Sequence, residues 1–68
     1  MAVIKIIELI GVSSKSWEDA VNNAVKDASK TIDNITGVEV IHATAKVKDG
    51  AVTEYRADVK VAFVVTDR

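Results

Sequence analysis

The chain has 68 residues, no cysteine, and nine basic against ten acidic residues, for a formal net charge of −1. These values indicate one small domain without disulfides or thiolate metal sites, and they give no electrostatic attraction to nucleic acid or to an anionic membrane. No apolar run approaches a membrane span, the N-terminus does not resemble a signal peptide, and the absence of cysteine fits a cytoplasmic location. Since a core in so short a chain rarely contributes more than ~3–5 kcal/mol, oligomerisation is the remaining way to gain stability.

Residues from about 3 to 10, VIKIIELI, are dense in valine and isoleucine and are predicted to form a strand that ends at Gly11. Both faces of this strand carry large aliphatic side chains: Ile4, Ile6 and Ile10 on one, and Val3, Ile7 and Leu9 on the other. A strand that is apolar on both faces in so small a chain indicates that a second subunit covers the face away from the chain's own core.

A helix is predicted from about residue 16 to 34. Ser16 can act as its N-cap, with Asp19 three residues on, close to the capping-box pattern. Apolar residues spaced three and four apart form one narrow, alanine-rich face that allows the helix to lie close to a sheet. These residues are Trp17, Ala20, Val21, Ala24, Ala28, Thr31, Ile32 and Ile35.

Two further strands are predicted, at about residues 37–48 and 51–65, joined by a type I′ hairpin turn at Asp49-Gly50. The apolar parity of the first of them changes near Val40, which indicates a one-residue bulge there or a change of face. The other alternates an apolar face with a charged row, which is either a solvated face or a subunit interface. The charged row consists of Glu54, Arg56, Asp58 and Lys60.

The β-α-β-β order predicts an α+β fold in which a three-stranded antiparallel sheet half-wraps one helix and leaves its far side exposed. His42 is the only imidazole and suits a surface or interface position, with ligand contact as the alternative. No nucleophile–base set accompanies it, so the chain is not expected to be an enzyme. No EF-hand loop is present, and a calcium site assembled from several subunits stays open. Trp17 is expected to serve packing rather than ligand stacking.

The stretches KIIELIGVSSKSWEDAVNNAV, TIDNITGVEV and EYRADVKVAF resemble the dodecins over nearly the whole chain. The resemblance implies a single dodecin-like domain at residues 1–68 and a hollow homododecamer, whose neighbouring subunits would cover the exposed sheet face. It also implies a flavin site, in which FMN or riboflavin stacks between symmetry-related tryptophans and a glutamine hydrogen-bonds the ring edge. In this sequence the tryptophan position is Gly37 and the glutamine position is Arg56.

Both departures predict that the usual flavin binding is weak or lost, because a glycine cannot stack and an arginine cannot accept a hydrogen bond. They resemble the flavin-independent branch that includes the calcium dodecin, and the family also implies coenzyme A as a ligand. We therefore expect a homododecamer that binds, buffers or stores a small ligand, with no metal ligands assigned. The alternatives are a scaffold oligomer without a ligand, or flavin binding by a modified pocket. Gly37 has a second explanation as a left-handed residue after the helix end.

Overall fold

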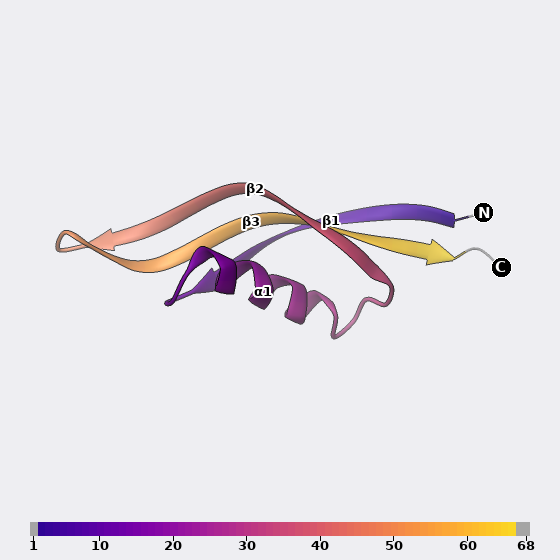
Figure 1. Cartoon of the computed structure of the whole chain (residues 1–68), viewed down its shortest axis with the longest axis horizontal. Coiled ribbons are helices and arrows are strands. Elements are labelled where there is room, and N and C mark those ends of the chain that lie inside the picture. The colour runs from indigo at the N-terminus through magenta and orange to yellow at the C-terminus, as the bar shows by residue number, and fades with distance from the viewer. Residues whose placement is uncertain (1, 67–68) are drawn as a thin grey trace.

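The computed structural model describes residues 2–66 and contains β1 (Ala2–Ser13), α1 (Trp17–Ala28), β2 (Ile35–Lys48) and β3 (Ala51–Thr66). The strands form one antiparallel sheet in the order β1-β3-β2, and α1 lies along one face of it (Figure 1). The α+β fold with β-α-β-β order is thereby confirmed. Residues 1 and 67–68 of the expected domain lie outside the described residues.

β1 is longer than the expected strand at residues 3–10, and the prediction that Gly11 ends it is wrong. The strand continues to Ser13, and Gly11 pairs with Ala57 of β3. A Cβ atom at Gly11 would overlap the carbonyl oxygen of Ala20 in α1. The glycine therefore lets the helix approach the sheet closely, which is a packing role and not a chain-breaking one.

The beginning of α1 is the expected one, but its end is not. Ser16 is the N-cap, and its hydroxyl accepts a hydrogen bond of 3.0 Å from the backbone N–H of Asp19. The helix ends at Ala28, whereas the apolar spacing predicted an end near residue 34. The residues that follow Lys30 are TIDN, which combine two β-branched residues with Asp and Asn, whose side chains compete for backbone hydrogen bonds. This stretch therefore has low helix propensity. Asn34 takes a left-handed φ of 64°.

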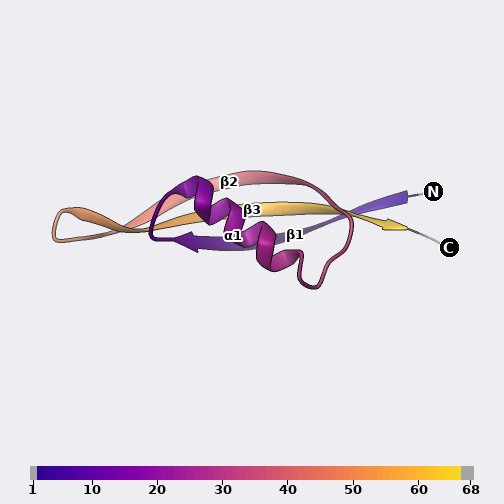
Figure 2. The ribbon, with the colours of Figure 1, turned by 60° about the horizontal axis from the view of Figure 1, so that its bottom comes forward.

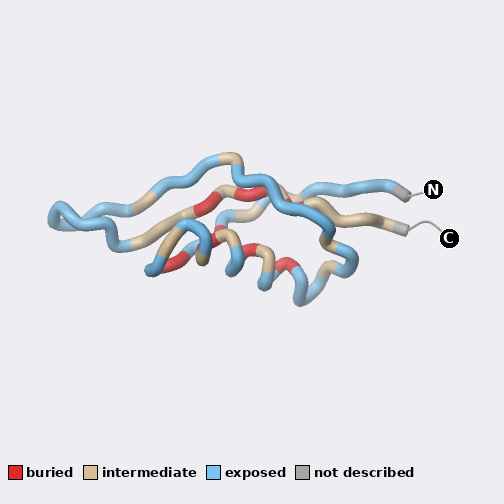
Figure 3. The backbone as a smooth tube through the Cα atoms, viewed as in Figure 1, coloured by how far each residue is buried: buried red, intermediate tan, exposed pale blue. Residues whose placement is uncertain are grey.

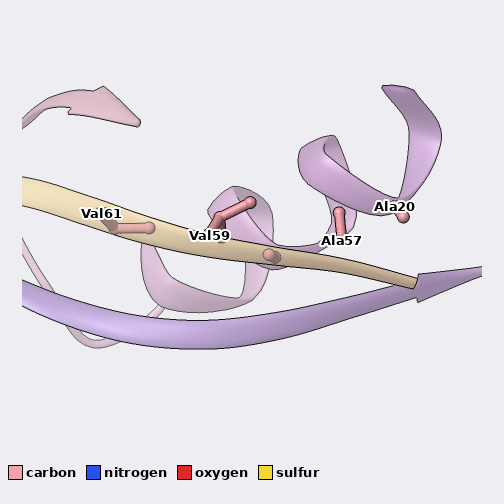
Figure 4. Close-up of a cluster of buried hydrophobic side chains, with 5 residues drawn as sticks. Ala20, Ala57, Val59 and Val61 are labelled. Atoms are coloured by element: carbon pink, nitrogen blue, oxygen red, sulfur yellow. The ribbon is translucent and has the colours of Figure 1, made fainter. Parts of the chain in front are cut away.

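The core is a thin layer of small side chains between α1 and β3. Ala20 and Ala24 face Ala57, Val59 and Val61, and all five are buried (Figure 4). The buried residues follow the inner side of α1 and the middle of β3, with most of β2 exposed (Figure 3). Since the largest fully buried side chains are two valines, the chain by itself holds a small core.

The hairpin of β2 and β3 has the predicted turn and the predicted bulge. Asp49 and Gly50 both have positive φ, 53° and 78°, as a type I′ turn requires. The pairing register shifts between Val40 and His42, which confirms the bulge near Val40. β2 begins at Ile35, two residues earlier than expected. The hairpin extends beyond the N-terminal end of α1 (Figure 2).

Candidate functional site

The sheet surface opposite α1, called the far face below, carries the residues expected to bind ligand. Because Ala57, Val59 and Val61 are buried against α1, the alternate residues of β3 point to the far face. The strand register adds their partners from β1 and β2. The far face comprises Ile4, Ile6, Glu8, Ile10 and Val12 of β1; Glu54, Arg56, Asp58, Lys60, Ala62 and Val64 of β3; and Gly37, Glu39, His42, Thr44 and Lys46 of β2.

Large aliphatic side chains of β1 lie bare on the far face. Ile4, Ile6 and Ile10 are 59–64% exposed, and Val12 is 45% exposed. No helix or strand within residues 2–66 covers this surface (Figure 1). The doubly apolar first strand inferred from the sequence is therefore present: Ile7 and Leu9 of one face pack against the core, Val3 is exposed, and the other face is open.

Gly37, Arg56 and His42 share the far face, but one chain does not gather them into one site. Gly37 pairs with Ala62, while Arg56 pairs with Thr44 of β2. At ~3.3 Å per residue along β3, Gly37 and Arg56 lie about 20 Å apart. A flavin-sized ligand can contact both positions only if they come from different copies of the chain.

Gly37 is not a left-handed residue after the helix end, so that explanation for this glycine is wrong. The left-handed residue after the helix is Asn34, not Gly37, which lies within β2. An ideal Cβ at Gly37 meets no atom within 4 Å. Neither a positive φ nor a close neighbour among residues 2–66 requires glycine here, so the space beside this position is open.

Arg56 is already engaged with a carboxylate of its own strand. Its Nε donates to Oε2 of Glu54 at 2.6 Å, and the two side chains are 43% and 30% exposed. Such charge-assisted bonds are short and strong. Since arginine has no acceptor atom, Arg56 cannot replace a glutamine that both donates and accepts.

His42 belongs to a charged cluster in the middle of the far face. Its Nδ1 lies 3.5 Å from Oδ2 of Asp58, the residue opposite it on β3. Oδ1 of Asp58 is buried and has no hydrogen-bond partner among the described residues. Asp58 raises the pKa of Glu8 above the ordinary glutamate value, first through a side-chain hydrogen bond and second through charge repulsion, while Lys60 and His42 act in the opposite direction.

The pairing of Glu8 with Asp58 was missed by the sequence analysis, which assigned no role to Glu8. The two residues are diagonal neighbours, because Glu8 lies opposite Lys60 and Ile10 lies opposite Asp58. The available signal was that Glu8 is the one carboxylate in β1. Its partner depends on the β1–β3 register, which local sequence does not specify.

Trp17 packs at the helix start, in agreement with the packing role expected of it. Its indole Nε1 donates to the carbonyl oxygen of Thr44 at 2.8 Å. Its ring meets Tyr55 edge-on, with 4.8 Å between ring centroids. These contacts join α1 to the hairpin although the side chain remains 42% exposed.

Two hollows in the described part of one chain lie away from the expected positions, and no metal site is complete there. Two open hollows of about 310 Å³ each lie beside α1 and beside the α1–β2 loop, and neither is lined by Gly37, Arg56 or His42. Within residues 2–66, no three side chains of the metal-binding types lie close enough to hold an ion. No helix in that range has both the length and the apolar character needed to cross a membrane.

Comparison with known proteins gives consistent matches. The sequence model of the dodecin family matches residues 3–66. Calcium dodecin of Mycobacterium tuberculosis is 36% identical over 63 residues, which cover 93% of this chain and 89% of that protein. Its crystal structure, described as calcium-chelating with a novel calcium-binding site, matches with a TM-score of 0.80 at 37% identity over 90% of this chain and 87% of that one. A crystal structure from Thermus thermophilus matches with a TM-score of 0.95 at 28% identity over the full length of both chains.

Proposed function

Because the chain belongs to the dodecin family, on its calcium-dodecin-like branch, we propose that it is a homododecameric small-ligand-binding protein that binds or buffers calcium and has lost the usual flavin binding. The proposal concerns binding and not catalysis. It joins two parts, self-association through the far face and a preference for a cation over a flavin, and each part has its own support.

The bare far face is the observation that carries the proposal. It combines four exposed aliphatic side chains with all three positions expected to contact a ligand. Full burial of one such side chain contributes roughly 1.5–3 kcal/mol. A chain whose own core is this small gains stability when other copies cover that surface, and their arrival would bring residues of different chains together.

The proposed loss of flavin binding rests on Gly37 and Arg56, the two positions where the family resemblance implies contacts with flavin. Gly37 provides no ring to stack, and open space replaces it. Arg56 presents a cation held by Glu54 instead of a neutral amide. An aromatic pair adds ~0.5–1.5 kcal/mol beyond its buried area, so its loss on both sides of a ligand lowers affinity substantially.

Calcium is proposed because the relative at 36% identity is a calcium dodecin. Calcium takes six to eight oxygen ligands in flexible geometry. The described residues of one chain do not gather three ligand side chains, so the proposed site would be assembled from several copies. Assembly and calcium binding would then depend on each other.

The test measures mass and ligand response on the same preparation. Light scattering is expected to give the mass of a homododecamer, and the purified protein is expected to be colourless. The unfolding temperature should rise with increasing Ca²⁺ by mass action, with Mg²⁺ as the control of equal charge, and should respond little to FMN or coenzyme A.

Each outcome addresses one part of the proposal. A monomer or dimer would disprove the cage. A yellow preparation that quenches flavin fluorescence at micromolar affinity would disprove the loss of flavin binding and favour a modified pocket. A homododecamer that responds to none of these ligands would be a scaffold without a ligand of these classes.

A further inference from the structure

The charged cluster at the centre of the far face has more carboxylates than one chain neutralises. Glu8 and Glu39 lie opposite Lys60 from its two sides, so the strand register gives two glutamates one lysine as their cross-strand partner. Arg56 is paired with Glu54. Asp58 is left with His42, which is charged only when protonated, at 3.5 Å.

A proton shared between Glu8 and Asp58 supplies the hydrogen-bond donor and the positive charge that this cluster lacks. Asp58 Oδ1 is buried without a donor among the described side chains, although the side chain of Asp58 as a whole is 24% exposed. An ionised Glu8 has no proton to donate, whereas a protonated carboxyl can hydrogen-bond a neighbouring carboxylate. Protonation of Glu8 thus replaces its repulsion from Asp58 with a hydrogen bond to Asp58. The hydrogen bond is the largest cause of the raised pKa of Glu8, and the repulsion is the second.

The position of the pair links this proton to assembly. Ile6 and Ile10 flank Glu8 on the same face of β1 and are 59% and 64% exposed. In the free chain water reaches Glu8 and weakens its repulsion from Asp58. A second copy that covers these aliphatic side chains would remove that water, and burial disfavours the charged form of a carboxyl group.

We propose that the Glu8–Asp58 pair is a proton-binding site coupled to self-association, so that covering the far face takes up a proton. The proposal rests on the self-association proposed above. A carboxyl group that binds protons more tightly in the assembled state strengthens assembly at low pH, and this contribution is lost as the pH rises through its pKa in the assembly. Mild acid therefore favours the assembly, and neutral to alkaline solution weakens it.

The main experiment compares the pH dependence of association in four proteins. Sedimentation between about pH 4.5 and 8 is expected to show that the association constant of the wild type falls as pH rises, about tenfold per copy for each unit by which assembly raises the pKa of Glu8. Glu8→Gln keeps a hydrogen-bond donor without the charge, so its association should not vary with pH over this range. Glu18→Gln removes an exposed glutamate of α1 and should behave as the wild type.

His42 requires its own control, because histidine also changes charge between about pH 5 and 8. His42→Gln should retain the pH dependence if the carboxylate pair causes it. Loss of the dependence in His42→Gln with retention in Glu8→Gln would overturn the proposal, as would equal dependence in the wild type and Glu8→Gln.

A direct titration separates this proposal from the self-association on which it rests. NMR of the labelled side-chain carboxyl carbons should show that the pKa of Glu8 lies above the ordinary glutamate value. If the wild type is monomeric at every pH, the proposed assembly fails, and the coupling fails with it. If it assembles and Glu8 titrates at the ordinary glutamate value, only the proton site is overturned.

Discussion

Gly11 and Gly37 lie on opposite faces of the sheet and meet very different surroundings. A Cβ at Gly11 would overlap the Ala20 carbonyl oxygen and approach Cβ of Ala24 to 3.0 Å. A Cβ at Gly37 would meet nothing within 4 Å, and its backbone does not have a positive φ. The first glycine serves the fold of one chain, and the second leaves a space on the surface that other copies are proposed to cover.

This contrast predicts opposite effects of the same substitution. Gly11→Ala should lower the free energy of unfolding by about 1–3 kcal/mol or more, because the helix must move away from the sheet. Gly37→Ala should raise it by ~0.4–1 kcal/mol, since alanine restricts the unfolded chain and fits the strand. Urea unfolding at matched protein concentration measures both. A destabilising Gly37→Ala would mean that another copy fills the space.

Among the elements, the junction of β1 and α1 is held by a compact set of hydrogen bonds. The Ser13 hydroxyl donates to Oδ2 of Asp19 at 2.6 Å and accepts from the backbone N–H of Lys15 at 2.9 Å. The Ser16 hydroxyl caps the backbone N–H of Asp19. Asn23 donates to the carbonyl oxygen of Val12 at 3.0 Å. A helix of 12 residues, marginal by itself, is thus anchored at its start.

Ser16→Ala tests that anchor. Loss of the cap should lower the free energy of unfolding by about 1 kcal/mol, because the N–H of Asp19 loses its acceptor. Ser14→Ala is the matched control, since the exposed Ser14 side chain makes no hydrogen bond with another described residue. Thermal unfolding followed by circular dichroism compares the two variants, and equal losses in both would contradict the assigned cap.

For the whole molecule, the decisive feature is a one-layer sheet with a helix on one side and, among residues 2–66, no helix or strand on the other (Figure 1). The radius of gyration is 14.0 Å and the longest extent 54 Å, which describes an elongated subunit. Its far face has aliphatic side chains along β1 on both sides of Glu8 and the charged cluster at the middle. This elongated shape with one uncovered sheet face suits a subunit of a larger assembly better than an independent domain.

Ile4→Lys tests whether the far face is the surface that assembles. Ile4 is 62% exposed, lies opposite Val64 and is flanked by Ile6. A charge placed among these side chains should be costly when another copy covers them, so the mass by light scattering should fall below that of the wild type. Asn22→Lys adds the same charge on the exposed side of α1. An unchanged mass for Ile4→Lys, with an unchanged mass for the control, would place the interface elsewhere.

Local signals predicted much of the fold because they act over a few residues. The period-two pattern of β3, the Asp49-Gly50 turn, the Ser16 cap and the bulge near Val40 each depend on neighbours in the chain, and each is present. The predicted end of the helix was wrong for the same reason, because apolar spacing is also a local signal. Ile32 and Ile35 continue the helical spacing, and spacing alone does not distinguish a helix from the loop and strand that follow it.

By itself the sequence determined the family and the order of the elements, and it has Gly37 and Arg56 where the resemblance implies a tryptophan and a glutamine, because these depend on which residues stand at which positions. Only the tertiary structure decided that Gly11 is a packing contact, that Gly37 and Arg56 lie about 20 Å apart, and that Glu8 meets Asp58. These depend on strand register and helix docking. Both are set by long-range burial of the Ala and Val core, and a shift of one residue would turn every side chain of a strand to the other face.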